Sequence, residues 1–237
     1  TWYNSPKVPG INPVPTDSTD FIDYKVAKKG ITVDLKKTMV SSPVPYKTGI
    51  IVPTLEGVIY NYDLQGEVLW WVDLNANVVS RPIIIGDKVF AGNVGGDIYQ
   101  IDLETGDILQ TLGINESITS QLVSFPVIFR DQQTNALLIG TANGTVYAYE
   151  TSDLTPMWKN EAAKGRIESL PVVLDNRVIF SAWDGMTYCI DLRTGKLNWK
   201  WSENVNFYYS TASCIPVTDG DHVWVVSPDR SVSCVDV

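Results

Sequence analysis

A Ser-x-Pro element recurs along the chain at a nearly constant spacing. Its prolines are Pro43, Pro82, Pro126, Pro171 and Pro216, so successive copies lie 39, 44, 45 and 45 residues apart. A second element, Gly-x-(Ile/Val/Thr)-Tyr-x-x-(Asp/Glu), begins 14 to 18 residues after each of the first four prolines and is degenerate after the fifth. A period of this length indicates a fold built from repeated structural units.

Each repeat predicts four short β-strands. Between the two elements lies a short, apolar, β-branched stretch such as residues 49–53 or 177–181, which is typical of buried strands. After the second element come a glycine-containing turn and an aromatic strand, as in Gly195 followed by Trp199. A four-stranded sheet cannot cover both of its apolar faces, so the repeats must stack face to face around an axis. The sequence therefore predicts an all-β fold, a β-propeller of about five four-stranded antiparallel blades.

The repeats resemble those of the pyrroloquinoline-quinone-like propeller family. The resemblance is carried by stretches such as Gly-Met-Thr-Tyr-Cys-Ile-Asp-Leu-Arg-Thr-Gly-Lys-Leu-Asn-Trp, and it covers roughly residues 31 to 237. It implies that Trp70, Trp158 and Trp199, at the start of the outermost strands, dock adjacent blades, and that Leu109 stands near that place in the second repeat. A shared fold does not name a ligand.

The domain organisation predicted from the repeats has two parts. Residues 1–30 read as an extended Pro-rich lead-in or linker, and residues 31–237 as the propeller. The expected blades lie near residues 36–74, 75–113, 114–161, 162–203, and 204–237 plus 31–35. The alternating segment 31–35 is expected to supply the fourth strand of the last blade and so to close the ring. The alternative is that the chain is a fragment of a longer propeller.

Composition excludes several classes of partner. The formal charge of -9 disfavours binding to nucleic acid or to anionic lipid headgroups. No apolar run approaches the ~20 residues of a transmembrane helix, so no transmembrane segment is expected. Cys189, Cys214 and Cys234 are an odd number without CxxC spacing, which favours buried thiols, although one disulfide within the last two repeats stays open.

Catalytic and cofactor motifs are not evident. The family's redox members resemble one another in a vicinal Cys-Cys pair, which this chain lacks, so no quinone cofactor is expected. His222 is the only histidine and follows a turn signal, which argues against a catalytic triad or a histidine-rich metal site. Glu116, Glu168, Asp184 and Asp229 are acids near predicted loops, and they leave carboxylate-based catalysis as an opening.

The sequence favours a noncatalytic binding or scaffolding module. Loops that run between blades, and from second to third strands, emerge on one face of a propeller, where ligands are expected. Cationic and aromatic residues gather there, and the predicted ligand-binding residues are Arg81, Arg166, Trp183, Tyr208 and Tyr209. The expected partner is a protein or a small polar or anionic ligand. The resemblance to assembly lipoproteins of the bacterial envelope favours a periplasmic or cell-surface location.

Two other functions stay open at this point. The chain would be an accessory domain of a larger hydrolase, such as a phosphoesterase or a glycan-active enzyme, if the Pro-rich start links it to a catalytic domain. It would be a stand-alone enzyme if a carboxylate pair met at the mouth of the axis.

Overall fold

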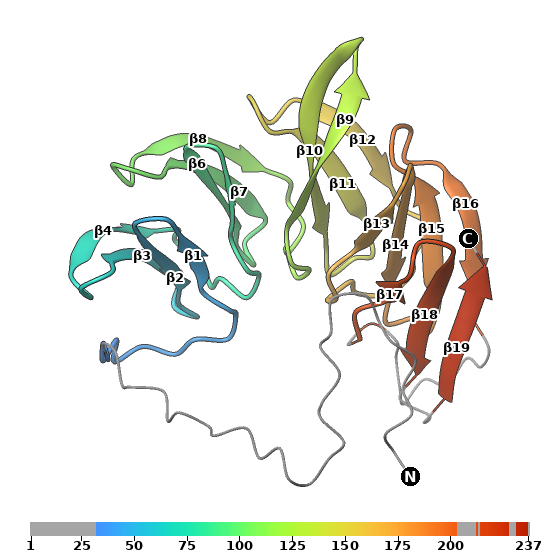
Figure 1. The fold of residues 1–237 in the computed structure, drawn as a ribbon, viewed down its shortest axis with the longest axis horizontal. Helices are drawn as coiled ribbons and strands as arrows, with labels where there is room; N and C mark the ends of the chain where they lie inside the picture. The colour runs from blue at the N-terminus through green and yellow to red at the C-terminus, as the bar shows by residue number, and fades with distance from the viewer. Residues whose placement is uncertain (1–31, 203–211, 213, 228–230, 237) are drawn as a thin grey trace, which may run out of the picture. The chain divides into compact units, whose positions relative to one another are not determined.

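A computed structural model describes residues 32–202, 212, 214–227 and 231–236 of the chain. The predicted lead-in of residues 1–30 lies outside these described residues. One compact unit runs from Asp34 to Val237, and its described residues contain five antiparallel β-sheets (Figure 1). Each sheet falls within one of the five repeats expected from the sequence.

Strands that follow one another along the chain pair antiparallel within each sheet. Sheet 1 comprises β1 (Val44–Tyr46), β2 (Gly49–Pro53), β3 (Val58–Asp63) and β4 (Val68–Asp73). Sheet 2 comprises β5 (Ile83–Ile85), β6 (Lys88–Gly92), β7 (Asp97–Asp102) and β8 (Ile108–Gly113). Sheet 3 comprises β9 (Val123–Phe129), β10 (Gln132–Gly140), β11 (Val146–Glu150) and β12 (Pro156–Asn160). Sheet 4 comprises β13 (Val172–Leu174), β14 (Arg177–Ser181), β15 (Thr187–Asp191) and β16 (Leu197–Trp201). Sheet 5 comprises β17 (Val217–Thr218), β18 (His222–Ser227) and β19 (Ser231–Asp236).

The aspartate that ends the second repeated element organises the turn into the outermost strand. The Asp63 carboxylate accepts the backbone N–H groups of Gln65 and Glu67, both at 2.8 Å. Asp102 and Asp191 accept the turn amides of sheets 2 and 4 in the same way. A short acidic side chain thus accepts hydrogen bonds from backbone N–H groups of the turn that the strand pairing leaves without a partner. This explains why an aspartate recurs at this place in the repeat.

Apolar side chains between neighbouring sheets form the core. Ile59 and Val89 share one cluster between sheets 1 and 2, and Phe90 and Leu137 lie in the next, between sheets 2 and 3. A third cluster joins sheets 3 and 4, and a smaller one joins sheets 4 and 5. Each sheet from the second to the fourth therefore buries both of its faces, as stacking of repeats requires.

The outermost strand of sheets 1 and 3 reaches the next sheet through a tryptophan. The Nε1–H of Trp70 donates to the carbonyl of Leu103 at 3.0 Å, and that of Trp158 donates to Leu192 at 2.8 Å. A register shift in the pairing of third with fourth strands precedes each tryptophan, and such bulges bend the strand. The indole then lies on a turn of the next sheet, where Gly195 meets Trp158.

Sheet 2 replaces this tryptophan by a glutamine. The register pairs Gln100 with Gln110, so Gln110, and not the neighbouring Leu109, occupies the place of Trp70 and Trp158. Its Nε2 donates to the carbonyl of Asp153 at 2.8 Å, which keeps the bond to the next sheet without the indole. In that turn the residue at positive φ is Leu154, at 56°. Without an indole above it, this position has room for a side chain.

The predicted fourth strand of the last blade is not observed. Residues 32–35 form no strand, and sheet 5 has three strands. Asp34 accepts the backbone N–H of Lys36 at 3.1 Å, and Lys36 has a φ of 49°, so the chain turns directly after the predicted segment. Among the described residues, β19 has no strand beyond it, and ring closure by residues 31–35 stays a prediction.

Candidate functional site

Two of the predicted site residues, Trp183 and Arg166, lie side by side. The backbone N–H of Trp183, in the β14–β15 turn, donates to the carbonyl of Arg166 at 2.9 Å. The Trp183 side chain is 46% exposed, and the half-exposed Arg166 guanidinium pairs with Glu168 at 2.9 Å. Gly165 permits this approach, since a Cβ at that position would collide with the backbone nitrogen of Asp184. The backbone contact thus brings together two residues that each expose a side chain, one aromatic and one cationic.

The other predicted residues are not joined to this pair by any observed contact. Arg81 lies between β4 and β5, and no described residue accepts a hydrogen bond from its buried Nε. Tyr208 and Tyr209 lie outside the described residues. In an antiparallel sheet, the loop before the first strand and the turn between the second and third strands lie at one end. Arg81 and Trp183 therefore occupy the same end of their own sheets.

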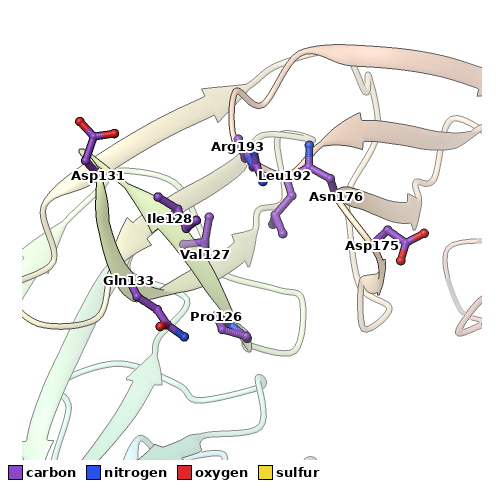
Figure 2. Close-up of a pocket in the computed structure, with 9 residues that line it drawn as sticks. All are labelled: Pro126, Val127, Ile128, Asp131, Gln133, Asp175, Asn176, Leu192 and Arg193. Atoms are coloured by element: carbon purple, nitrogen blue, oxygen red, sulfur yellow. The ribbon is translucent and has the colours of Figure 1, made fainter.

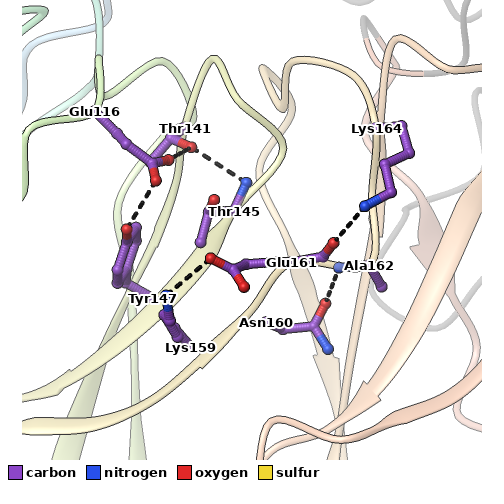
Figure 3. A network of polar contacts seen from close by, with 9 residues as sticks. All are labelled: Glu116, Thr141, Thr145, Tyr147, Lys159, Asn160, Glu161, Ala162 and Lys164. Atoms are coloured by element: carbon purple, nitrogen blue, oxygen red, sulfur yellow. Dashed lines mark hydrogen bonds and ion pairs between the residues drawn. The ribbon is translucent and has the colours of Figure 1, made fainter.

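A carboxylate at this end of sheet 3 takes part in a polar network (Figure 3). Glu116, which follows β8, accepts a hydrogen bond from the Thr141 hydroxyl at 2.6 Å and another from the Tyr147 hydroxyl at 3.0 Å. Burial, helped by the bond to Glu116, raises the pKa of Tyr147 to about 12. Nearby, Lys159 pairs with Glu161 at 2.8 Å. Glu116 therefore ties the loop after sheet 2 to sheet 3.

Stability at alkaline pH should report on this network. The ordinary pKa of tyrosine is 10.0 and that of folded Tyr147 is about 12, so the folded state holds the proton more tightly. The stabilisation of the folded state by the protonated Tyr147 hydroxyl is complete below pH 10 and is lost as the pH rises through about 12. We expect Tyr147→Phe to lower the free energy of unfolding by about 1 kcal/mol at pH 7 and to flatten its decline between pH 10 and 12. Urea unfolding at several pH values measures both effects, and an unchanged pH profile would contradict the assignment.

Three of the four acids with catalytic potential are engaged in scaffold contacts. Glu116 holds Thr141 and Tyr147 as described, and Glu168 pairs with Arg166. Asp184 accepts the Tyr188 hydroxyl at 2.6 Å and a backbone N–H at 2.7 Å. The fourth, Asp229, lies outside the described residues.

Neither a metal cluster nor a membrane span is found in the part of the chain that the structure describes. No three His, Cys, Asp or Glu side chains there are arranged to hold a metal ion. The backbone N–H of His222 donates to the Asp219 carboxylate at 2.8 Å, and its Nδ1 lies 3.2 Å from the same carboxylate. No helix formed by these residues has the length and apolar character to cross a membrane.

The opposite ends of sheets 3 and 4 form a pocket of about 690 Å³ (Figure 2). One wall comes from the β9–β10 hairpin, through Pro126, Val127 and Ile128. The other wall comes from the β13–β14 and β15–β16 turns and includes Leu192 and Arg193. The sequence prediction placed the site at the other end of the sheets and missed this pocket.

Comparison with known proteins assigns a family. The model of the family described as outer membrane protein assembly factor BamB matches residues 26–237. The chain belongs to the BamB family. A curated relative, the outer membrane protein assembly factor BamB of Shewanella oneidensis, is 23% identical over 70% of this chain and 44% of its own length. The chain spans about half the length of the curated relatives it matches.

Solved structures agree with this family at the level of the fold. BamB from Moraxella catarrhalis has a TM-score of 0.51 and 18% identity, over 80% of this chain and 70% of that structure. A quinohemoprotein alcohol dehydrogenase from Pseudomonas putida HK5 has a TM-score of 0.67 and 15% identity, over 86% of this chain and 41% of that structure. The BamB-family chain therefore has the predicted all-β propeller fold.

The residues of this BamB-family chain do not fit a quinone cofactor of the dehydrogenase kind. Cys189 is buried in sheet 4 and Cys234 lies exposed on β19, while Cys214 is half-buried, and all three are free thiols. None is adjacent to another in the sequence. The described residues thus offer neither the vicinal pair of cysteines nor a metal-binding cluster, and the likeness to the dehydrogenase concerns the fold alone.

Proposed function

We propose that this chain is a noncatalytic propeller module that binds a protein partner in the bacterial cell envelope, with a periplasmic or cell-surface location. The proposal rests on membership of the BamB family, whose model is described as an outer membrane protein assembly factor. Hydrogen bonds or an ion pair within the chain already involve Glu116, Glu168 and Asp184, which also favours binding over carboxylate catalysis.

The pair Trp183 and Arg166 is the binding surface that we assign to this partner. Trp and Arg dominate the energetics of protein interfaces because they combine a large apolar area with directional hydrogen bonding. The exposed Trp183 is the observation that carries the assignment, since it lies in a fixed turn and contributes little to the core. Arg81, which lies at the same end of its own sheet, is the second cation that we assign to the partner side of the molecule.

Site-specific cross-linking in the host bacterium tests this surface. A photoreactive amino acid at position 183 or 166 should trap one and the same envelope protein, identified by mass spectrometry. Leu109, exposed on β8, is the control position and should not trap it. The proposal is wrong if neither position gives a specific product.

The affinity of the purified complex gives the quantitative prediction. We expect Trp183→Ala to weaken binding of the trapped partner about tenfold, or ~1.4 kcal/mol, with an unchanged thermal unfolding midpoint because the side chain is half exposed. Trp71→Ala, which removes an exposed indole from β4, is the matched control and should leave the affinity unchanged. Calorimetric titration measures both, and equal affinities for the two variants would refute the assignment.

A further inference from the structure

The hairpin formed by β9 and β10 is longer than its counterparts. β9 has seven residues and β10 has nine, whereas the first strands of sheets 1, 2 and 4 have three residues and their second strands have five. Figure 1 shows the two strands continuing together toward a tip, and Ile128 near that tip is 61% exposed. The extra length of the hairpin therefore presents apolar surface to solvent. Packing of the core does not explain this additional length.

The tip of this hairpin is a tight two-residue turn. Arg130 and Asp131 both have positive φ, at 49° and 62°, and neither is glycine. A turn of this kind matches the twist of the two strands and fixes their register, and Asn-Gly would form it with less strain. The Arg130 guanidinium lies over the Phe129 ring at 4.9 Å. The extended hairpin is thus held as a regular two-stranded arm.

The pocket beside the arm is lined by residues of both of its strands. Within the described part of the chain, the strand order β12-β11-β10-β9 makes β9 an edge strand. Pro126, Val127 and Ile128 all line the pocket although they are consecutive. Gln133, which pairs with Ile128 across the hairpin, lines the pocket as well, so its wall includes β10 beside β9. Figure 2 shows Val127 and Ile128 on the side of the arm that faces Leu192.

The register determines which backbone groups this edge exposes. Phe129 pairs with Gln132 across the two-residue turn, and in such a hairpin this is the hydrogen-bonded pair, after which bonded and non-bonded pairs alternate. The peptide groups of Phe129 and Val127 therefore face β10, while those of Ile128 and Pro126 face the open edge. Ile128 offers an N–H and a C=O there, and Pro126, which has no N–H, offers a C=O.

We propose that the open edge of β9 binds an extended segment of a partner protein, which pairs with Ile128 and places an apolar side chain in the pocket. The exposed N–H and C=O groups are spaced to recognise extended backbone, and Val127, Ile128 and Leu192 provide aliphatic walls for the side chain. Pro126 interrupts the donors, so the paired segment is short. This inference rests on the proposed function in that the partner is a protein, but it assigns a second site, at the opposite end of the sheets from Trp183.

The test uses a phage-displayed library of random twelve-residue peptides selected on the complete chain. Selected peptides should carry large apolar or β-branched residues at alternate positions. Ile128→Pro removes the outward N–H without removing a donor to β10, and we expect it to weaken binding of the selected peptide at least tenfold. Ile128→Ala keeps that N–H and should weaken binding only about threefold. Hydrogen exchange of the Ile128 amide in the wild-type chain should slow on peptide binding, a readout that needs no variant.

The outcomes separate this site from the proposed function. Trp183→Ala should bind the peptide as the wild type does. The strand-edge site is refuted if no peptide is enriched, if Ile128→Pro binds as tightly as Ile128→Ala, or if exchange of the Ile128 amide is unaffected. A chain that binds its envelope partner through Trp183 but enriches no peptide would refute this inference alone, and the converse result would refute only the proposed Trp183 surface.

Discussion

Replacement of Trp70 by alanine is expected to lower the free energy of unfolding by about 3–5 kcal/mol. Trp70 is only 8% exposed, lies in the cluster between sheets 1 and 2, and donates its indole N–H to Leu103 at 3.0 Å. The substitution removes this apolar area, leaves a cavity between two sheets and deprives the Leu103 carbonyl of its donor. Urea unfolding followed by circular dichroism measures the loss.

The neighbouring Trp71 is the matched control. It is 62% exposed on the other side of the same strand, so Trp71→Ala should change the free energy of unfolding by no more than about 0.5 kcal/mol. Trp70→Phe, which keeps most of the apolar area but loses the donor, should fall between the two. Equal losses for Trp70→Ala and Trp71→Ala would mean that Trp70 does not join the sheets in solution.

A single methyl group at Gly195 should cost about 3 kcal/mol. Gly195 has a φ of 67°, and a Cβ there would lie 2.5 Å from the Trp158 ring. Gly195→Ala therefore combines left-handed backbone strain of about 1–2 kcal/mol with overpacking of about 1–3 kcal/mol. Because the ring belongs to sheet 3 and the glycine to sheet 4, the substitution should separate the two sheets, which raises the exposure of the Trp158 indole and shifts its fluorescence to longer wavelength.

Gly86 is the control position, because it has similar backbone strain without the collision. Its φ of 62° is close to that of Gly195, but nothing lies within 4 Å of the Cβ position. Gly86→Ala should therefore cost about 1 kcal/mol, from strain alone. If both alanine variants lose the same stability, the close packing of Trp158 on Gly195 is absent. Chemical denaturation of the two variants and the wild type decides the matter.

The repeat period was enough to predict the fold class because each repeat has to pack its strands in the same way. Each Ser-x-Pro element and each Tyr-x-x-(Asp/Glu) element marks a strand with the same neighbours, so five copies imply five similar sheets. The turn aspartates are an example of this repetition, since Asp63, Asp102 and Asp191 each accept hydrogen bonds from the backbone amides of their own turn. Such local contacts can be predicted from the local sequence.

Contacts between repeats were predicted less well. Closure of the last sheet by the alternating segment 31–35 stays a prediction, and alternation alone does not reveal that Asp34 bonds the amide of Lys36 directly after that segment. Leu109 was aligned with the docking tryptophans, whereas the register places Gln110 there. A one-residue shift reverses the face of a strand, and spacing alone did not resolve it.

The role of the predicted site residues stays a prediction. The sequence selected Trp183 and Arg166, and the structure places them in contact, whereas Arg81 is not joined to them by any observed contact. The pocket along β9 was missed, although the sequence contained a signal. Gly144 follows Pro126 by 18 residues, whereas Gly57 follows Pro43 by 14, and these four additional residues lengthen the β9–β10 arm. Insertions in single repeats often lie on the binding face of a repeat protein, so this difference in spacing was the available signal.

The tryptophan contacts between sheets also set an order for folding during synthesis. Trp70 bonds a residue 33 positions later in the chain, and Trp158 bonds one 34 positions later. When a sheet has just left the ribosome, its outermost indole still lacks the turn on which it docks, and that turn is synthesised almost one repeat later. Translation at about 5–20 residues per second makes this delay a few seconds for sheets 1 and 3. Throughout that time the indole of sheet 1 or sheet 3 lacks the partner on which it packs in the folded chain.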